Sequence, residues 1–288
     1  MTNATMTDQN STACISSQDN IPGSDLEAFE YLSKWIGIYT GLHFPVNKHI
    51  NLYRRLISLC QRLDFKNLNE MAEHLQRQDI PGLPAELARV TSTNHSFFFR
   101  ENEILDFFRN RILPTLPADS PWRIWSAAAA SGEEAYTLAI IMAEELGLSQ
   151  ALNRVAILGT DISYPMITQA EEGIYHKQKL EVVNPATLKH YFKPGNPDQF
   201  SIMPWIKPMC TFRRMNLKST PWPFQNQFHV IFCRNILYYF DHALQLEIVE
   251  RMYDYTLPGG WLVTSVTENL KKSPTRWRSI TTGVYRKI

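Results

Sequence analysis

The sequence has few cysteines, and their arrangement does not predict a metal centre. Among 288 residues there are four, Cys14, Cys60, Cys210 and Cys233, without a Cys-x-x-Cys pair or a histidine at metal-ligand spacing. Such separations predict neither a zinc site nor a disulfide framework, and unpaired thiols fit a reducing compartment. We therefore expect a cytoplasmic protein that uses no metal.

Long hydrophobic runs and a strong charge of one sign are missing too. No stretch is as long and apolar as a membrane span, and residues 1–24 are polar, which predicts a disordered tail without a signal peptide. The formal net charge is +1, so the chain is no general polyanion binder, and we expect no nucleic-acid partner. An apolar fraction of 44% predicts a globular protein with a substantial core.

Apolar residues recur at helical spacing in the first third of the chain. The pattern predicts a small all-helical domain over residues 25–91, with helices over 25–40, 46–63, 67–76 and 84–90. The second helix carries four basic residues, Lys48, Arg54, Arg55 and Arg62. Three of them recur every seven residues and share one face. A solvated helix face is the usual explanation for such a run of charges. Because these charges are all positive and no acidic residue lies between them, we favour an acidic partner.

Residues 91–100 form a polar loop that ends in three phenylalanines and Arg100. Asn94 or Ser96 is expected to cap the helix that follows. Three consecutive aromatic side chains cannot all face one core, so we expect at least one to line a pocket or an interface.

The most informative stretch is a strand, turn and helix over residues 122–142. An apolar run is followed by seven residues that are only Ser, Ala or Gly, and the helical pattern begins at Glu133. The glycine patterns of dinucleotide and phosphate loops are absent. Two adjacent carboxylates, Glu133 and Glu134, would repel a polyphosphate and suit a cationic ligand. On this stretch alone, an ordinary turn with exposed glutamates is an equally good explanation.

Polar residues also follow two later strands. The buried strand over 155–161 ends at Asp161, where an acid commonly binds ribose, although a helix cap is the competing explanation. The strand over 228–233 leads into Arg234 and Asn235. Helices alternate with these strands, which predicts an α/β fold with a doubly wound, mostly parallel sheet.

Four segments in this order resemble the chemotaxis receptor methyltransferases (CheR type), which methylate receptor glutamates with S-adenosylmethionine. They lie at residues 93–101, 124–134, 160–162 and 232–241. The resemblance implies a class I methyltransferase domain over residues 92–288, a receptor-contacting helical domain over 25–91, and an inserted small β element at about 197–213. Residues 265–269 depart from the family pattern, reading Ser-Val-Thr-Glu-Asn in place of Gly-x-Ser-Glu-Asn.

The resemblance also implies roles for individual residues. The implied cofactor contacts are Asn94, Ser96, Arg100, Glu134, Asp161, Asn216, Leu217, Arg234 and Asn235. Glu134 would bind the methionyl ammonium and Asp161 the ribose. Arg100 and Tyr239 are the expected catalytic residues. The basic residues Lys48, Arg54, Arg55 and Arg62 would bind the substrate.

The expected function is therefore O-methylation of glutamate side chains on the cytoplasmic helices of methyl-accepting chemotaxis receptors, with S-adenosylhomocysteine as product. A glutamate carboxylate is ionised at neutral pH, so the reaction needs no general base. We expect a monomer that meets the membrane only through its receptor. The alternatives are a methyltransferase of the same fold with another substrate, and a non-catalytic module that binds the cofactor or the receptor.

Overall fold

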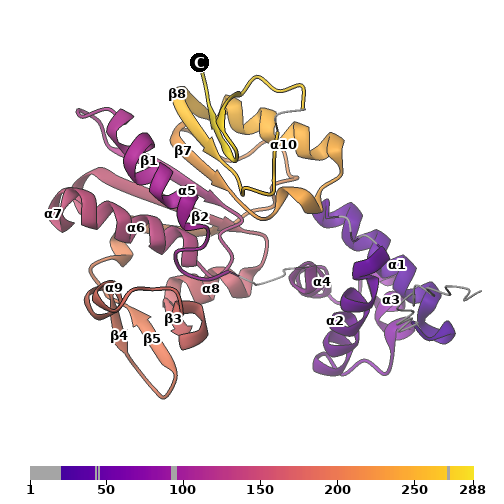
Figure 1. Ribbon diagram of the computed structural model, residues 1–288. Coiled ribbons are helices and arrows are strands. Elements are labelled where there is room, and N and C mark those ends of the chain that lie inside the picture. Colours follow the sequence, from indigo (N-terminus) through magenta and orange to yellow (C-terminus); the bar gives the residue numbers. More distant parts are fainter. Residues whose placement is uncertain (1–20, 43, 45, 92–95, 271–272) are drawn as a thin grey trace, which may run out of the picture.

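The computed structural model describes residues 21–42, 44, 46–91, 96–270 and 273–288 (Figure 1). The predicted tail therefore lies almost wholly outside the described residues. The amino-terminal part is helical: α1 (Gly23–Thr40), η1 (Val46–Lys48), α2 (His49–Arg62), α3 (Leu68–Arg77) and α4 (Leu83–Thr91). These helices enclose their own apolar cluster, which includes Phe29, Leu56 and Met71. Among the described residues, no helix combines the length and apolarity that a membrane span requires.

A seven-stranded sheet forms the body of the rest of the chain. Its strands are β1 (Trp122–Ala127), β2 (Val155–Asp161), β6 (Cys210–Arg214), β7 (Phe228–Cys233), β8 (Thr256–Val263), β9 (Arg278–Thr281) and β10 (Val284–Arg286), in the order β6-β2-β1-β7-β8-β10-β9. The first five strands in this order run parallel to one another. β10 pairs antiparallel with β8, and β9 pairs antiparallel with β10. The strand order reverses between β1 and β7, which is where doubly wound sheets bind ligands. The predicted fold class is confirmed.

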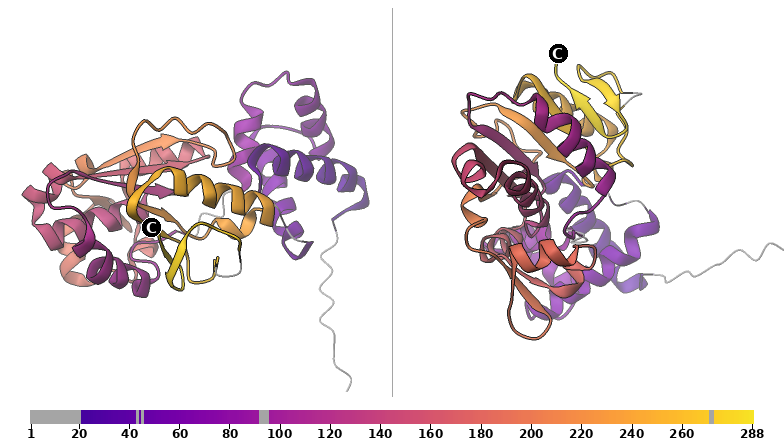
Figure 2. Two further views of the ribbon diagram at one scale, coloured as in Figure 1. Left: turned by 90° about the horizontal axis from the view of Figure 1, so that it is seen from above. Right: turned by 60° about the vertical axis from the view of Figure 1, so that its left-hand side comes forward.

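Helices cover both faces of this sheet (Figure 2). They are α5 (Asn102–Phe107) with its continuation η2 (Phe108–Ile112), η3 (Leu113–Thr115), α6 (Glu133–Leu146), α7 (Leu148–Arg154), α8 (Tyr164–Glu172) and α10 (His242–Asp254). Alternation along the strands builds the two layers, because successive side chains point to opposite faces. Ile124 packs into the cluster with α6, whereas its neighbour Trp125 packs into the cluster with α10.

The helix after the phenylalanines begins later than expected. The residue before it, Glu101, has a left-handed backbone with φ of 60°, and α5 starts at Asn102. The expectation that Ser96 caps this helix is wrong, because five residues of loop and turn structure separate Ser96 from Asn102. Asn94 lies outside the described residues.

A second, three-stranded sheet is inserted between α8 and β6, at the lower left of Figure 1. It consists of β3 (Ile174–His176), η4 (Lys177–Leu180), α9 (Pro185–Tyr191), β4 (Phe192–Pro194) and β5 (Gln199–Ile202), with antiparallel strands ordered β3-β5-β4. The predicted position of 197–213 is corrected to 174–202. Residues after Met203 form turns and η5 (Lys207–Met209), and β6 joins the edge of the main sheet.

The end of α1 is bonded to the segments that follow β6 and β7 of the main sheet. Leu42 forms an isolated antiparallel bridge with Phe240, and Asn216 Nδ2 donates to the carbonyl of Tyr39 at 2.9 Å. Gly41 ends α1 with φ of 82°, and a Cβ at this position would lie 2.6 Å from Leu244. The helical part therefore reaches the carboxyl end of the sheet.

Candidate functional site

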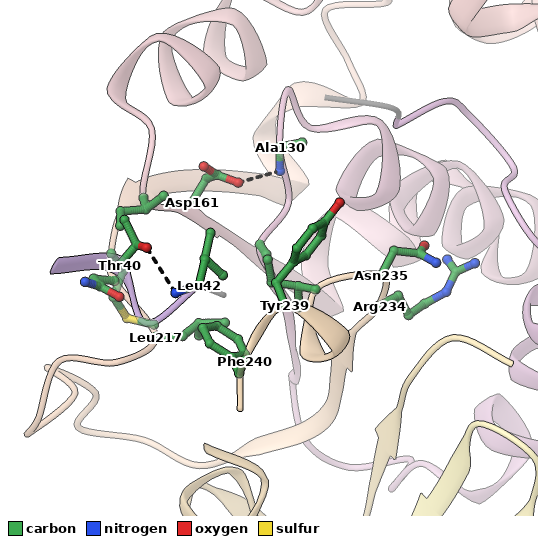
Figure 3. A pocket seen from close by; sticks show the side chains of 14 residues that line it. Thr40, Leu42, Ala130, Asp161, Leu217, Arg234, Asn235, Tyr239 and Phe240 are labelled. Atoms are coloured by element: carbon green, nitrogen blue, oxygen red, sulfur yellow. Dashed lines mark hydrogen bonds between the residues drawn. The ribbon is translucent and has the colours of Figure 1, made fainter. Parts of the chain in front are cut away.

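Three adjoining cavities lie at the carboxyl ends of β1, β2 and β7. The Asp161 cavity (about 700 Å³) is lined by residues that follow these strands and by Thr40 and Leu42 at the end of α1 (Figure 3). The Glu134 cavity (about 560 Å³) shares Ala128, Ala130, Arg234 and Asn235 with it. The Lys48 cavity (about 900 Å³) adds residues of η1 and α2. Asn235 lines all three, so one elongated ligand and its reaction partner could meet there.

Most of the predicted site residues line these cavities. Those in the Asp161 or Glu134 cavity are Ser96, Arg100, Glu134, Asp161, Asn216, Leu217, Arg234, Asn235 and Tyr239. Lys48 and Arg55 line the third cavity, together with Arg100 and Tyr239. Arg54 and Arg62 line none of the three.

The turn after β1 combines two kinds of small residue. Ala128 and Ala130 line the cavities and have left-handed backbones, with φ of 61° and 48°. Gly132 serves packing instead, because a Cβ there would lie 2.9 Å from that of Ala170 and 3.1 Å from the Phe212 ring. Close ligand approach therefore explains only part of the small-residue run.

Glu134 is held at the start of α6 by two donors. Ser126 Oγ donates to its Oε1 at 2.6 Å, and Arg234 Nη1 donates to Oε2 at 3.0 Å. The carboxylate keeps 15% of its surface exposed, whereas Arg234 keeps 3%. A carboxylate has about four acceptor positions, so Glu134 retains acceptor capacity toward the cavity.

Asp161 ends β2 and faces the first cavity. Its Oδ2 accepts from the Ala130 amide at 3.0 Å and its Oδ1 from the Ser163 amide at 2.9 Å. Burial raises the pKa of this carboxyl to about 6, against the opposing effect of the two amides. Asp161 is therefore ionised above about pH 7 and loses its charge in mild acid.

The loop that follows β7 depends on an acid that the sequence analysis did not single out. Glu268 accepts from the amides of Asn235 (2.8 Å), Leu237 (2.7 Å) and Ser265 (3.1 Å). Burial raises the pKa of its carboxyl above the ordinary value. Asn235 itself has φ of 61°, so these bonds hold a left-handed backbone in place. The comparison of residues 265–269 with the family pattern was the one available signal for Glu268.

Glu101 is a second acid that the sequence analysis missed. It accepts from Asn235 Nδ2 at 3.0 Å and from Ser265 Oγ at 2.9 Å, and it lies 3.3 Å from Arg234 Nη2. Burial opposes its ionisation, but Arg234 and these donors hold the pKa of Glu101 below its ordinary value. Nothing local in the sequence pairs Glu101 with a loop 134 residues away.

The Lys48 cavity is basic and aromatic. Lys48 Nζ lies 4.8 Å from the Tyr239 ring centroid and 5.4 Å from that of Tyr238. Arg55 and Arg100 line the same space. Tyr239 lines both the Asp161 and the Lys48 cavities, and in Figure 3 its ring lies between Asp161 and Asn235.

The basic stripe on α2 is divided in the structure. Arg62 forms an ion pair of 2.5 Å with Glu86 on α4, so the acid missing from α2 comes from another helix. The phenylalanine expectation is confirmed: Phe97 lines the Glu134 cavity, while Phe98 is wholly buried. Among the described residues, no group of three metal-ligating side chains comes together.

Comparisons with known proteins give one consistent result. Residues 94–286 match the family described as "CheR methyltransferase, SAM binding domain". A chemotaxis protein methyltransferase of Borreliella burgdorferi is 34% identical over 238 residues, which cover 80% of this chain and 84% of that protein. Chemotaxis protein methyltransferase 1 of Pseudomonas aeruginosa is 31% identical over 264 residues, covering 89% and 94%. The Escherichia coli chemotaxis protein methyltransferase is 28% identical over 248 residues, covering 84% of each chain.

The Glu268 contacts predict a stability effect. Glu268→Ala would leave the buried amides of Asn235, Leu237 and Ser265 without their acceptor, and we expect a loss of roughly 2–4 kcal/mol in the free energy of unfolding. Urea unfolding measures this loss. Glu181→Ala, at an exposed position, serves as control and should change little. An unchanged urea midpoint for Glu268→Ala would contradict the role of these bonds.

Proposed function

The chain belongs to the CheR methyltransferase family, and we propose that it esterifies glutamate side chains of chemotaxis receptors with the methyl group of S-adenosylmethionine. The observation that carries this proposal is the match over residues 94–286, whose range includes both the Asp161 and the Glu134 side chains. The relatives that cover most of the chain are named as chemotaxis methyltransferases. S-adenosylmethionine is the cofactor that the family description gives.

The carboxylates and apolar side chains of the first two cavities suit this cofactor. Asp161 offers acceptor positions for ribose hydroxyls, and Leu42, Leu217 and Phe240 give that cavity an apolar wall for the adenine ring. Glu134 offers a carboxylate for the methionyl ammonium. When bound, the cofactor supplies a methyl group on a positively charged sulfur. We assign Asn94, Ser96, Arg234 and Asn235 to the same cofactor site.

Asn216 has a more limited role in this proposal than the resemblance implied. Its amide nitrogen donates to the Tyr39 carbonyl, and its Oδ1 accepts from the Lys218 amide at 2.9 Å. Both polar atoms of the side chain are therefore engaged. We propose that Asn216 shapes the adenine end by holding α1 against the cavity.

Arg100 and Tyr239 are the proposed catalytic residues. The acceptor is already a carboxylate at neutral pH, so the protein's contribution is to orient it, and orientation can supply roughly 7–11 kcal/mol. Arg100 borders both the Glu134 and the Lys48 cavities, where a carboxylate would meet its fork of donors. Its guanidinium lies 3.9 Å from Glu101, and this neighbour weakens its hold on the substrate. Strong neutralisation of the nucleophile would slow methyl transfer.

The Lys48 cavity is the proposed entrance for the substrate. Lys48, Arg55 and Arg100 together give it a positive lining that suits an acidic receptor helix. We assign receptor contact to the helical domain over residues 25–91 and to the three-stranded sheet. A monomer in the cytoplasm that works on receptor helices, without nucleic acid, is part of the same proposal.

A methyl-labelling assay tests the proposed reaction. The protein, labelled S-adenosylmethionine and receptor-bearing membranes should give label that is released by alkali, because carboxyl methyl esters hydrolyse and N-methyl groups do not. Arg100→Ala should fold and incorporate far less label. Label that resists alkali, or none on receptors, would contradict glutamate esterification.

The raised pKa of Asp161 predicts how cofactor binding depends on pH. If the carboxylate form accepts the ribose hydroxyls, affinity should be constant above about pH 7 and should fall by up to about tenfold per pH unit below about 6. Calorimetric titration with S-adenosylhomocysteine measures this dependence. Asp161→Asn should bind more weakly at neutral pH and lack the inflection. An inflection near pH 6 that persists in Asp161→Asn would assign it to another group.

The divided basic stripe predicts a difference between two pairs of charge reversals on η1 and α2. Lys48→Glu/Arg55→Glu should raise the KM for receptor about tenfold or more, because both residues line the entrance. Arg54→Glu/Arg62→Glu makes the same change in charge away from the cavity and serves as control. S-adenosylhomocysteine affinity should stay the same in both. Equal effects of the two pairs on KM would mean that only the overall charge matters.

A further inference from the structure

A buried ion pair joins the three-stranded sheet to the start of α6. Glu133, the neighbour of Glu134, is fully buried, and its Oε1 accepts from Ser131 Oγ at 2.7 Å. Lys179 Nζ lies 3.1 Å from the same oxygen. Lys179 belongs to η4, the turn that follows β3. A carboxylate without access to water is stable only when it is paired with a cation, and the ammonium group of Lys179 is that cation.

Lys179 also holds the loop that carries Ser96 and Arg100. Its Nζ donates to the Ser96 carbonyl, and its own carbonyl accepts from the Phe98 amide at 3.0 Å. Both the side chain and the backbone of one residue are therefore bonded to this loop. Ser96 and Arg100 of this loop and Glu134 of α6 line the same cavity.

Aromatic contacts strengthen the same connection. The ring of the buried Phe98 packs edge to face against the rings of Tyr175 in β3 and Phe192 in β4. In both pairs the ring centroids are 4.8 Å apart. Tyr175 Oη donates to the Ser131 carbonyl at 2.8 Å, next to Glu133. The small sheet thus packs against both the loop and the turn before α6.

We infer that Lys179 is a positioning residue of the cofactor site, because it fixes the loop over residues 96–100 relative to α6. Its ammonium bridges the Glu133 carboxylate and the Ser96 carbonyl, so a residue of the inserted sheet joins two segments that line the Glu134 cavity. The sheet is then part of the cofactor-binding machinery. This inference rests on the proposed function.

The effect of Lys179 on binding can be tested separately from its effect on folding. Its ion pair with Glu133 should affect mainly the melting temperature, and its bond to Ser96 should affect mainly cofactor binding. Lys179→Met leaves a buried unpaired carboxylate and an untethered loop, which should lower the melting temperature and weaken S-adenosylhomocysteine binding about tenfold or more. In Glu133→Gln/Lys179→Met the buried charge is gone. Its melting temperature should recover toward wild type while binding stays weak, because the Ser96 tether is still missing.

The control is Lys177→Met in the same turn. Lys177 forms an exposed ion pair of 2.6 Å with Asp198, and its loss should leave binding and melting temperature unchanged. Steady-state kinetics add a second readout: for the double variant, the KM for S-adenosylmethionine should rise while the KM for receptor does not.

Two results would overturn the inference. One is wild-type affinity for S-adenosylhomocysteine in Lys179→Met, and the other is affinity that recovers together with melting temperature in the double variant. The double variant keeps the test valid if Lys179→Met does not fold. A wild-type protein that binds no S-adenosylhomocysteine would instead overturn the cofactor assignment, and this inference with it.

Discussion

The site depends on one buried guanidinium. Arg234, at the end of β7, is 3.0 Å from Glu134 and 3.3 Å from Glu101, and it donates to the Arg100 carbonyl at 2.5 Å. These groups come from three separate segments of the chain. Two carboxylates so close together would repel each other without the cation, and the cation would be costly to bury without them. One shared cation therefore joins the three segments where the strand order reverses.

Glutamate side chains stabilise this part of the protein in two different ways. Glu134 and Glu101 both pair with Arg234, and Glu134 also lines a cavity. Glu133 and Glu268 are buried beside them and act as fixed acceptors for an ammonium group and for backbone amides. The two adjacent acids of α6 therefore have separate roles. Glu134 lines the cavity, whereas Glu133 binds the lysine that holds the neighbouring loop.

The parts of the fold that follow from local patterns were predictable from sequence. The apolar runs of the central strands, the glycine end of α1 and the acid at the end of β2 are all visible within short windows, and all occur where expected. Other features depend on partners far along the chain. Glu268 bonds to an amide 33 residues away, and Arg62 meets Glu86 only after two helices pack. The small sheet was misplaced because β3 and β4 have three residues each, too few to show an alternating pattern.

The bridge between Leu42 and Phe240 has a consequence for how this enzyme can be divided. Thr40 ends the first helix and Leu42 follows it, yet both form part of the wall around the Asp161 cavity. A fragment that begins after residue 91 would keep every strand of the main sheet and still leave the Asp161 cavity open on one side. The boundary suggested by sequence thus runs through the wall of one cavity, to which the helical part and the methyltransferase domain both contribute.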